Sequence, residues 1–259
     1  MPESGSVHQR SETMKEKRSY TYRIEPRDSD YTRHATLCGL TEYILHVAGE
    51  DADRNGFGVR DLNRMNASWV LIRMGIEIER MPREYEQIRI TTWVSKVTRA
   101  MTTRNFEVID ASGAIICRCV TNWAMIELTE RRIMDLNLLS GGSSMTEDYE
   151  MPIRMPARLA KPHEEHHAGH KVSYSDLDFN CHANSAKYLE WAVDTYPLET
   201  VCDKGFRRVD INFLHETRYG EDIEIVWEGE ENRLFEMRNG HGEVVCRLCF
   251  DTGQCIAEM

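Results

Sequence analysis

Residues 176–188 read DLDFNCHANSAKY, and the first eight of them match residues 28–35, DSDYTRHA, without a gap. Both aspartates, the histidine and the alanine are identical in the two stretches, and the aromatic position is kept. Two further blocks repeat in the same order, because residues 76–78 match 211–213 and residues 104–119 match 233–248. The chain therefore contains two copies of one unit, and this repeat sets the architecture that every other motif must fit.

Each copy predicts one helix followed by several antiparallel strands. Apolar residues at helical spacing predict a helix from about Leu37 to Gly56 in the first copy. In the second copy, Asn184 or Ser185 can cap a helix that ends near Pro197. The later segments alternate with a period of two, as half-buried strands do. The predicted fold class is α+β, with each helix packed on an antiparallel sheet and the two sheets joined edge to edge as an intramolecular pseudo-dimer. The apolar helix positions are Leu40, Tyr43, Ile44, Val47 and Ala48, and then Tyr188, Leu189, Trp191 and Ala192.

Composition divides the chain into four expected segments. We expect a polar, disordered tail at 1–19, a first domain at 20–134, a linker at 135–163 and a second domain at 164–259. The linker holds three of the seven prolines, at 152, 156 and 162, together with the run SGGSS at 140–144, and such a composition is typical of connecting segments.

Charge and hydropathy exclude several classes of protein. The 259 residues carry 32 Lys and Arg against 43 Asp and Glu, a net charge of −11, which argues against nucleic-acid binding. Charged residues interrupt every long apolar stretch, so no membrane span is expected. The tail resembles neither a secretory signal nor a transit peptide, and the eight cysteines are too sparse for a disulfide scaffold. We expect a cytoplasmic protein with reduced thiols.

The two copies differ most in their polar side chains. The second copy offers an imidazole, two carboxylates and an amide, whereas the first has lost one carboxylate and the amide. This asymmetry is what a duplicated enzyme with one surviving site would show. The second-copy set is Asp178, Asn180, His182 and Glu216, and the matched first-copy residues are Asp30, Thr32, His34 and Met81.

The position of this set suggests a hydrolytic mechanism. Asn180 and His182 lie in the loop before the second helix, where unpaired backbone N–H groups can receive a developing oxyanion. A histidine–carboxylate pair can take a proton from water, for a gain of roughly 10²–10⁴-fold, while the amide orients that water. The alternative interpretation is structural: Asp178 and Asn180 cap turns, and His182 is a half-buried core histidine.

The stretch at 176–188 is similar to the Asp-Leu-Asp-x-Asn-x-His-x-Asn-Asn-x-Lys-Tyr signature of the acyl-acyl carrier protein (acyl-ACP) thioesterases. Residues 69–73, 80–82 and 92–94 also look like strands of that family's first domain, and the resemblance covers nearly everything after the tail. It implies two tandem hotdog domains, with the acyl chain held by the first and catalysis in the second. By position it assigns the catalytic set to Asp178, Asn180, His182 and Glu216.

The implied reaction is hydrolysis of fatty acyl-ACP to free fatty acid and holo-ACP, which terminates fatty acid synthesis, without a metal or nucleotide cofactor. Two departures from the family pattern stand out. Thr217 replaces the cysteine that follows the glutamate in many plant members, so a cysteine nucleophile has no candidate there, and Ser185 replaces the second asparagine. The lack of a transit peptide indicates a bacterial member.

A basic strip suggests where the acidic carrier protein would dock. Residues 87–105 contain no acid, although the chain as a whole is acidic. The alternative interpretation is that these basic residues only form the solvated edge of a hairpin. The sequence also leaves open whether the fused pair acts alone or forms a homodimer through an exposed sheet edge. The basic residues of the strip are Arg89, Lys96, Arg99 and Arg104.

Two other functions stay open on sequence grounds, namely an acyl-coenzyme A hydrolase and a non-catalytic acyl-binding sensor.

Other motifs in the sequence favour no metal, thiol or nucleotide chemistry. The histidines at 163, 166, 167 and 170 have no cysteine at zinc-ligand spacing, and Cys181 is expected to point away from His182. The glycine pairs at 56–58 and 240–242 lack the third glycine of a dinucleotide fingerprint, and no Gly-x-Ser-x-Gly elbow is present.

Overall fold

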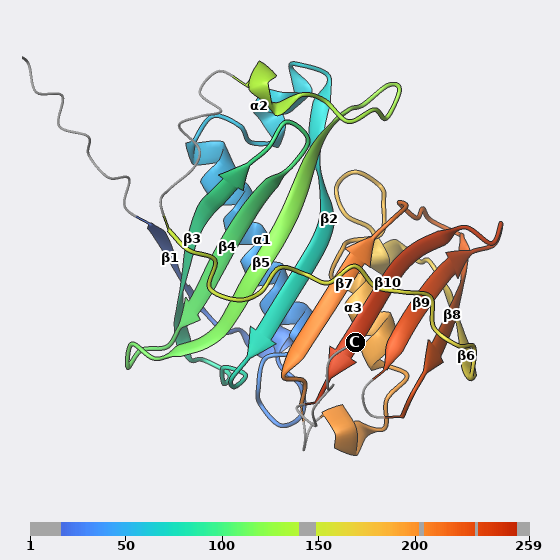
Figure 1. Ribbon diagram of the computed structural model, residues 1–259. Coiled ribbons are helices and arrows are strands. Elements are labelled where there is room, and N and C mark those ends of the chain that lie inside the picture. Colours follow the sequence, from blue (N-terminus) through green and yellow to red (C-terminus); the bar gives the residue numbers. More distant parts are fainter. Residues whose placement is uncertain (1–16, 140–148, 202–204, 231–232, 253–259) are drawn as a thin grey trace, which may run out of the picture.

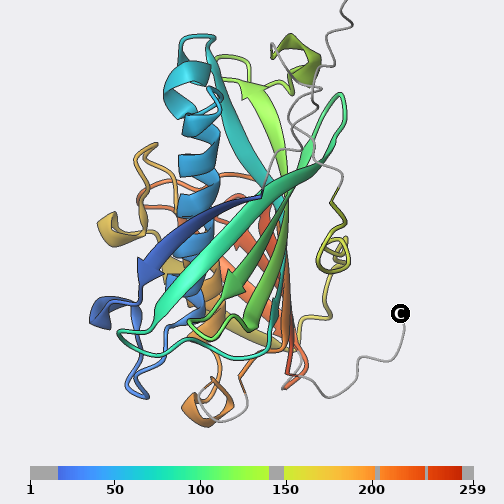
Figure 2. The same cartoon turned by 90° about the vertical axis from the view of Figure 1, so that its left-hand side faces the viewer.

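One antiparallel sheet of ten strands runs through the whole molecule in the order β1-β3-β4-β5-β2-β7-β10-β9-β8-β6 (Figure 1). The computed structural model describes residues 17–139, 149–201, 205–230 and 233–252. Residues 1–16 of the expected tail and the SGGSS run of the expected linker lie outside the described residues. The helices lie on one face of the sheet (Figure 2).

The first half contains strands β1 to β5 and the long helix α1, Leu37–Arg54. Thr36 caps the helix, because its side chain accepts the backbone N–H of Gly39 at 3.0 Å. A Cβ on Gly39 would lie 2.9 Å from the backbone oxygen of Asp28, so the glycine lets the helix approach the 28–35 loop closely. The buried stripe of α1 packs on the sheet as its apolar spacing predicts. The strands are Arg18–Arg23 (β1), Ala67–Ile78 (β2), Gln87–Val97 (β3), Thr102–Ile109 (β4) and Ile115–Glu127 (β5).

The second half repeats this arrangement with a shorter helix, α3, Lys187–Val193. Its N-cap is Ala186, so the expected cap at Asn184 or Ser185 is wrong by one or two positions. Asn184 contributes in a different way, because its side-chain oxygen accepts the backbone N–H of Ala186 at 3.0 Å. The strands are His166–Lys171 (β6), Arg208–Phe213 (β7), Asp222–Glu228 (β8), Leu234–Asn239 (β9) and Val244–Asp251 (β10).

The two half-sheets meet where β2 pairs with β7, and this seam shows the internal symmetry directly. Gly75 lies opposite Asp210, and these two residues are also equivalent in the repeat. An antiparallel pair whose facing residues are each other's counterparts is centred on a pseudo-twofold axis. The strand order reads the same outward from this axis on both sides, which confirms the α+β pseudo-dimer predicted from the repeat.

Residues 149–165, which precede β6, cross the face of the sheet opposite the helices (Figures 1 and 2). It is held by side chains of β7: Ala157 N–H donates to Asp210 at 3.2 Å, and Leu159 N–H donates to Asn212 at 3.0 Å. Asn212 also donates to the carbonyl of Ala157 at 2.8 Å. These bonds satisfy backbone groups that burial on the sheet would otherwise leave unpaired.

Smaller elements complete the described fold. A second helix of the first half, α2 at Val59–Asn63, was not expected from the sequence, and short 3-10 turns occur at Pro26–Asp28 (η1), Leu136–Leu138 (η2) and Tyr174–Asp176 (η4). Strand β1 begins at Arg18, two residues before the expected start of the first domain. No helix among the described residues combines the length and apolar character that a membrane crossing requires.

Candidate functional site

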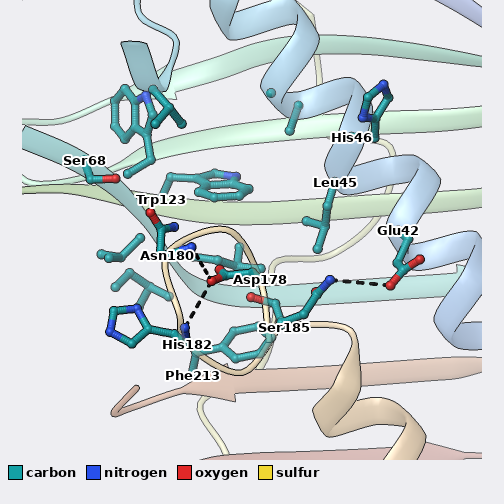
Figure 3. Close-up of a pocket in the computed structure, with 18 of the residues that line it drawn as sticks. Glu42, Leu45, His46, Ser68, Trp123, Asp178, Asn180, His182, Ser185 and Phe213 are labelled. Carbon is teal, nitrogen blue, oxygen red and sulfur yellow. Dashed lines mark hydrogen bonds between the residues drawn. The ribbon is translucent and has the colours of Figure 1, made fainter. Parts of the chain in front are cut away.

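A cavity of about 1830 Å³ is lined by residues of both halves. Its wall includes α1, the start of β2, the loop 178–185 and residues 213–216. All four side chains predicted from the sequence line it, namely Asp178, Asn180, His182 and Glu216. Figure 3 shows three of them around the cavity, with Glu42, Leu45 and His46 of α1. Among the described residues, none of the four first-copy counterparts lines this cavity.

The loop 178–183 is shaped by the carboxylate of Asp178. Its Oδ1 atom accepts the backbone N–H groups of Asn180 at 2.8 Å and His182 at 3.2 Å (Figure 3). Cys181 takes the left-handed conformation, with φ of 60°, and its counterpart Arg33 has φ of 63°. The same turn therefore occurs in both copies, and in the second it places Asn180 and His182 at the cavity.

An equivalent backbone hydrogen bond in each copy ties this turn to the rest of its half. Ala35 N–H donates to Pro82 at 2.8 Å, and Ala183 N–H donates to Thr217 at 2.9 Å. Pro82 and Thr217 are therefore structurally equivalent, which supports the alignment made from the sequence. The residues that precede these two acceptors are Met81 and Glu216.

His182 and Glu216 form the central pair of the site. The Nε2 atom of His182 lies 3.3 Å from Oε2 of Glu216, and the two side chains are 19% and 34% exposed. The other oxygen of Glu216 forms an ion pair with Arg131, which comes from the loop after β5 in the first half. Arg131 also lines the cavity and has a left-handed backbone, with φ of 57°. The imidazole and the carboxylate are thus within reach of the same water molecule, and a cation from the other half fixes the carboxylate.

The amide of Asn180 has no hydrogen-bond partner among the described residues, so it is free to bind a ligand in the cavity. The expected unpaired N–H groups at the start of the helix are only partly present. Ala186 N–H donates to the side chain of Asn184, and Lys187 N–H donates to the carbonyl of Asn184 at 2.9 Å. Because these donors are used inside the turn, the helix start is a poor oxyanion site, and that expectation is wrong for these two groups.

Among the described residues that line the cavity, none is a cysteine that could act as a nucleophile. Thr217, at the position of the plant cysteine, is buried, and its hydroxyl lies 2.8 Å from that of Tyr188. Cys181 is exposed and is not among the residues that line the cavity, although it precedes His182 directly in sequence.

Sequence reasoning missed two residues of the site, Arg131 and Glu42. Glu42 lies on α1, lines the cavity and accepts the side-chain N–H of Asn184 at 3.4 Å (Figure 3). Burial raises the pKa of Glu42 above its ordinary value, although Lys187 opposes the shift. Arg131 belongs to no repeated block, and Glu42 falls on Glu190 at the offset that aligns the two loops. The contacts of both residues cross the seam, so only the three-dimensional pairing of the halves reveals them.

The basic strip is less uniform than the sequence suggested. Arg104 is only 7% exposed and forms an ion pair with Asp51 at 2.6 Å, so it cannot belong to a docking surface. Its position on β4 aligns with Phe106 and Val108, which face the core. Arg89, Lys96 and Arg99 are exposed, and Arg99 pairs with Asp135 at 2.8 Å.

The histidines near β6 have structural partners. His170 lies 3.0 Å from Asp176 and stacks on Trp191 with ring centroids 4.3 Å apart. His166 stacks on Trp227 at 5.3 Å. Each of these two imidazoles is thus held by an aromatic neighbour within the second half.

Comparison with known sequences agrees with the two-copy architecture. Residues 15–137 match the family model for the acyl-ACP thioesterase N-terminal domain, and residues 159–253 match that for the acyl-ACP thioesterase C-terminal domain. The oleoyl-acyl carrier protein thioesterase of Coriandrum sativum chloroplasts is 22% identical over 208 residues, or 73% of this chain. The chain spans 56% of the length of that relative.

Solved structures show the same arrangement along nearly the whole chain. An acyl-ACP thioesterase from Bacteroides thetaiotaomicron is 34% identical, with a TM-score of 0.82 over 90% of this chain and 96% of its own. The 12:0-ACP thioesterase from Umbellularia californica, at 18% identity and a TM-score of 0.76 over 90% of this chain and 95% of its own, shows that the hotdog fold is shared. The two family matches together cover most of the residues, and the chain therefore belongs to the acyl-ACP thioesterase family.

Proposed function

We propose that this protein hydrolyses fatty acyl-ACP thioesters to free fatty acids and holo-ACP. The observation that carries the proposal is the His182–Glu216 pair, 3.3 Å apart, in a cavity large enough for an acyl chain. Membership in the acyl-ACP thioesterase family and the similarity to the acyl-ACP thioesterase from Bacteroides thetaiotaomicron support the same reaction.

The reaction is the addition of water to the thioester carbonyl. Glu216 and His182 take the proton of the attacking water, which gives a tetrahedral oxyanion, and Asn180 orients the water or the substrate through its unused amide. The intermediate expels the carrier's thiolate, which receives the proton. The products are a fatty acid and the free carrier thiol, so atoms and charge balance without a covalent enzyme intermediate.

Asp178 is assigned a positioning role. Its Oδ1 atom is occupied by two backbone N–H groups of its own loop, so it sets the places of Asn180 and His182. Arg131 acts in a similar way on Glu216 from the first half. The proposed site thus consists of Asn180, His182 and Glu216, which act on water or substrate, with Asp178 and Arg131 as positioning residues.

The two halves divide the work in this proposal. The first domain, 20–134, holds the acyl chain between α1 and its half of the sheet. Most residues that line the cavity belong to this half, and they come mainly from α1 and from β2 to β5. The second domain, 164–259, supplies the catalytic set, and residues 135–163 connect the two.

For carrier docking, the exposed Lys96 and Arg99 are the favoured cations. They lie at the end of the sheet where β3 ends and where the loop carrying Arg131 follows β5. Arg89 is seven residues from Lys96 on the same strand, or roughly 23 Å away. Lys96 and Arg99 thus lie at the end of the molecule that holds the site, and Arg89 lies towards the other.

The test is thiol release from carrier-linked acyl chains of several lengths by the wild type, Glu216→Ala and His182→Ala. Each variant should lower kcat by about 10²–10⁴-fold with little change in KM. His34→Ala, the counterpart in the first half, is the matched control and should keep near-normal kcat. Release from acyl-coenzyme A with a higher kcat/KM than from the carrier would replace the carrier with coenzyme A. Acyl binding without hydrolysis of either substrate would select a sensor.

A further inference from the structure

A buried ion pair lies in the cavity wall well away from the His182–Glu216 pair. Asp51 of α1 and Arg104 of β4 are 2.6 Å apart, with side chains only 8% and 9% exposed, and both line the cavity. Strand β4 is separated from β7 by β5 and β2, so this pair lies roughly 14 Å across the sheet from the strand that precedes Glu216. An acyl chain that extends from the reacting carbonyl under α1 would approach it.

The carboxylate of Asp51 is fully engaged. It accepts the hydroxyl of Tyr20 at 3.0 Å and the side-chain amide of Asn55 at 3.2 Å, and Arg18 lies 3.6 Å away. Burial and the nearby Asp51 carboxylate raise the pKa of Tyr20 to about 12, so its hydroxyl remains a donor. Two arginines therefore share one carboxylate, which leaves this end of the cavity with an excess of positive charge.

The guanidinium of Arg104 is only half engaged. Its Nη1 atom contacts Asp51 and donates to Thr92 at 3.3 Å, but Nε and Nη2 have no acceptor among the residues that the structure describes. Neither atom is among the fully shielded polar side-chain atoms that lack a partner, and Arg104 lines the cavity, so an oxygen atom of a ligand in the cavity can accept from them.

The second half shows what a purely structural arginine looks like at the equivalent position. Arg233, the counterpart of Arg104, donates from Nε to the carbonyl of Glu230 at 2.8 Å and from Nη1 to the carbonyl of Thr195 at 2.9 Å. Its guanidinium also lies 3.9 Å from the ring of Tyr196, and it does not line the described cavity. The open donors are thus a property of the copy that contributes most of the cavity wall.

We propose that Arg104 and Asp51 form a polar subsite at the far end of the acyl cavity, which accepts an oxygen on the distal part of an acyl chain. The same subsite disfavours a plain methyl end, because that end would cover the guanidinium without offering an acceptor. The acyl substrate rests on the proposed function, but the subsite itself can be tested by binding alone.

The binding test compares two free fatty acids with equal numbers of non-hydrogen atoms, one ending in a methyl group and one in a hydroxyl group. Titration calorimetry on the wild type, over a series of chain lengths, should show tighter binding of the hydroxylated acid once the chain is long enough to reach Arg104. In Arg104→Lys, which keeps the charge but loses the Nε and Nη2 donors, this preference should fall by about tenfold. The double variant Asp51→Asn/Arg104→Met removes both charges together, so no lone buried charge remains to unfold the protein, and it should abolish the preference.

Arg233→Lys is the matched control and should leave the preference unchanged. An equal preference in the wild type, Arg104→Lys and the folded double variant, at every chain length, would overturn the subsite. Thiol release from the corresponding carrier-linked chains gives a separate readout. If the wild type releases no thiol from any chain but binds the hydroxylated acids through Arg104, the proposed function fails and the subsite stands. If the wild type hydrolyses all chains without an Arg104-dependent preference, the subsite fails and the proposed function stands.

Discussion

Arg131 of the first half forms an ion pair with Glu216 of the second half. One oxygen of the proposed catalytic carboxylate is thus held by the half that lacks the catalytic set, while the other faces His182. The site is therefore a joint product of both copies. A change in how the two halves pair would alter the Arg131–Glu216 contact, and with it the orientation of Glu216, even if no residue of the second half changed.

Arg131→Gln should lower kcat by about tenfold and leave KM nearly unchanged, because Glu216 would lose the contact that fixes its orientation towards His182. Steady-state kinetics on a carrier-linked substrate measures this. The neighbouring Arg132, 74% exposed and paired only with Glu130 among the described residues, is the matched control as Arg132→Gln. Equal kcat in both variants would show that Arg131 does not position Glu216.

Asp178→Ala and Asp30→Ala form a matched pair, since each carboxylate accepts backbone N–H groups of the same turn. Both variants should lose about 1–3 kcal/mol of unfolding free energy in denaturant titrations. Only Asp178→Ala should also lose more than about tenfold in kcat, because only its loop carries Asn180 and His182 into the cavity. A comparable loss of kcat in Asp30→Ala would contradict the assignment of catalysis to the second half.

Reversal of charge in Lys96→Glu/Arg99→Glu should raise KM for a carrier-linked substrate by about tenfold and spare a small synthetic thioester. The effect should shrink as salt is added, because exposed charges are screened. Lys161→Glu/Lys171→Glu reverses two charges that are 61% and 68% exposed in and near the second half, and it serves as the control. An equal rise in KM for both substrates in Lys96→Glu/Arg99→Glu would contradict the assignment of Lys96 and Arg99 to carrier docking.

Asp176→Asn should destabilise the fold at neutral pH by about 1–3 kcal/mol, with a difference that disappears in acid. Burial alone would raise the pKa of Asp176, but hydrogen bonds from Ser173 and His170 outweigh it and lower the pKa to about 2. The stabilisation from the charged carboxylate is thus present above about pH 4 and is lost as the pH falls through about 2. Denaturant titrations of both proteins across this range measure it. Asp222→Asn, whose side chain is 76% exposed, should show no such pH-dependent difference from wild type.

The repeat was enough to predict the sheet and the place of the four polar side chains. Aligned blocks imply equivalent strands, and the strand order is indeed the same on both sides of the seam. The turn around His182 was predictable because its short-range hydrogen bonds depend on Asp178 and on local spacing alone.

What the sequence could not supply depends on long-range packing. Arg131 meets Glu216 only because β2 and β7 join the half-sheets, and nothing in the sequence near Arg131 encodes this contact. The length of α3 was missed because the apolar spacing continues past Val193 towards Tyr196, which instead packs on Phe206 and Phe250. The burial of Arg104 was readable in principle, since it alternates in phase with Phe106 and Val108.

The seam between Gly75 and Asp210 makes the two halves dependent on each other. A Cβ at Gly75 would lie 3.0 Å from Oδ1 of Asp210, so the aspartate fits because its neighbour has no side chain. Two copies of the second half, joined in the same way, would place two aspartates face to face on the axis, and two copies of the first would leave the space of that side chain empty. The seam therefore favours one copy of each half over two copies of either, because its central contact needs a glycine on one strand and an aspartate on the other.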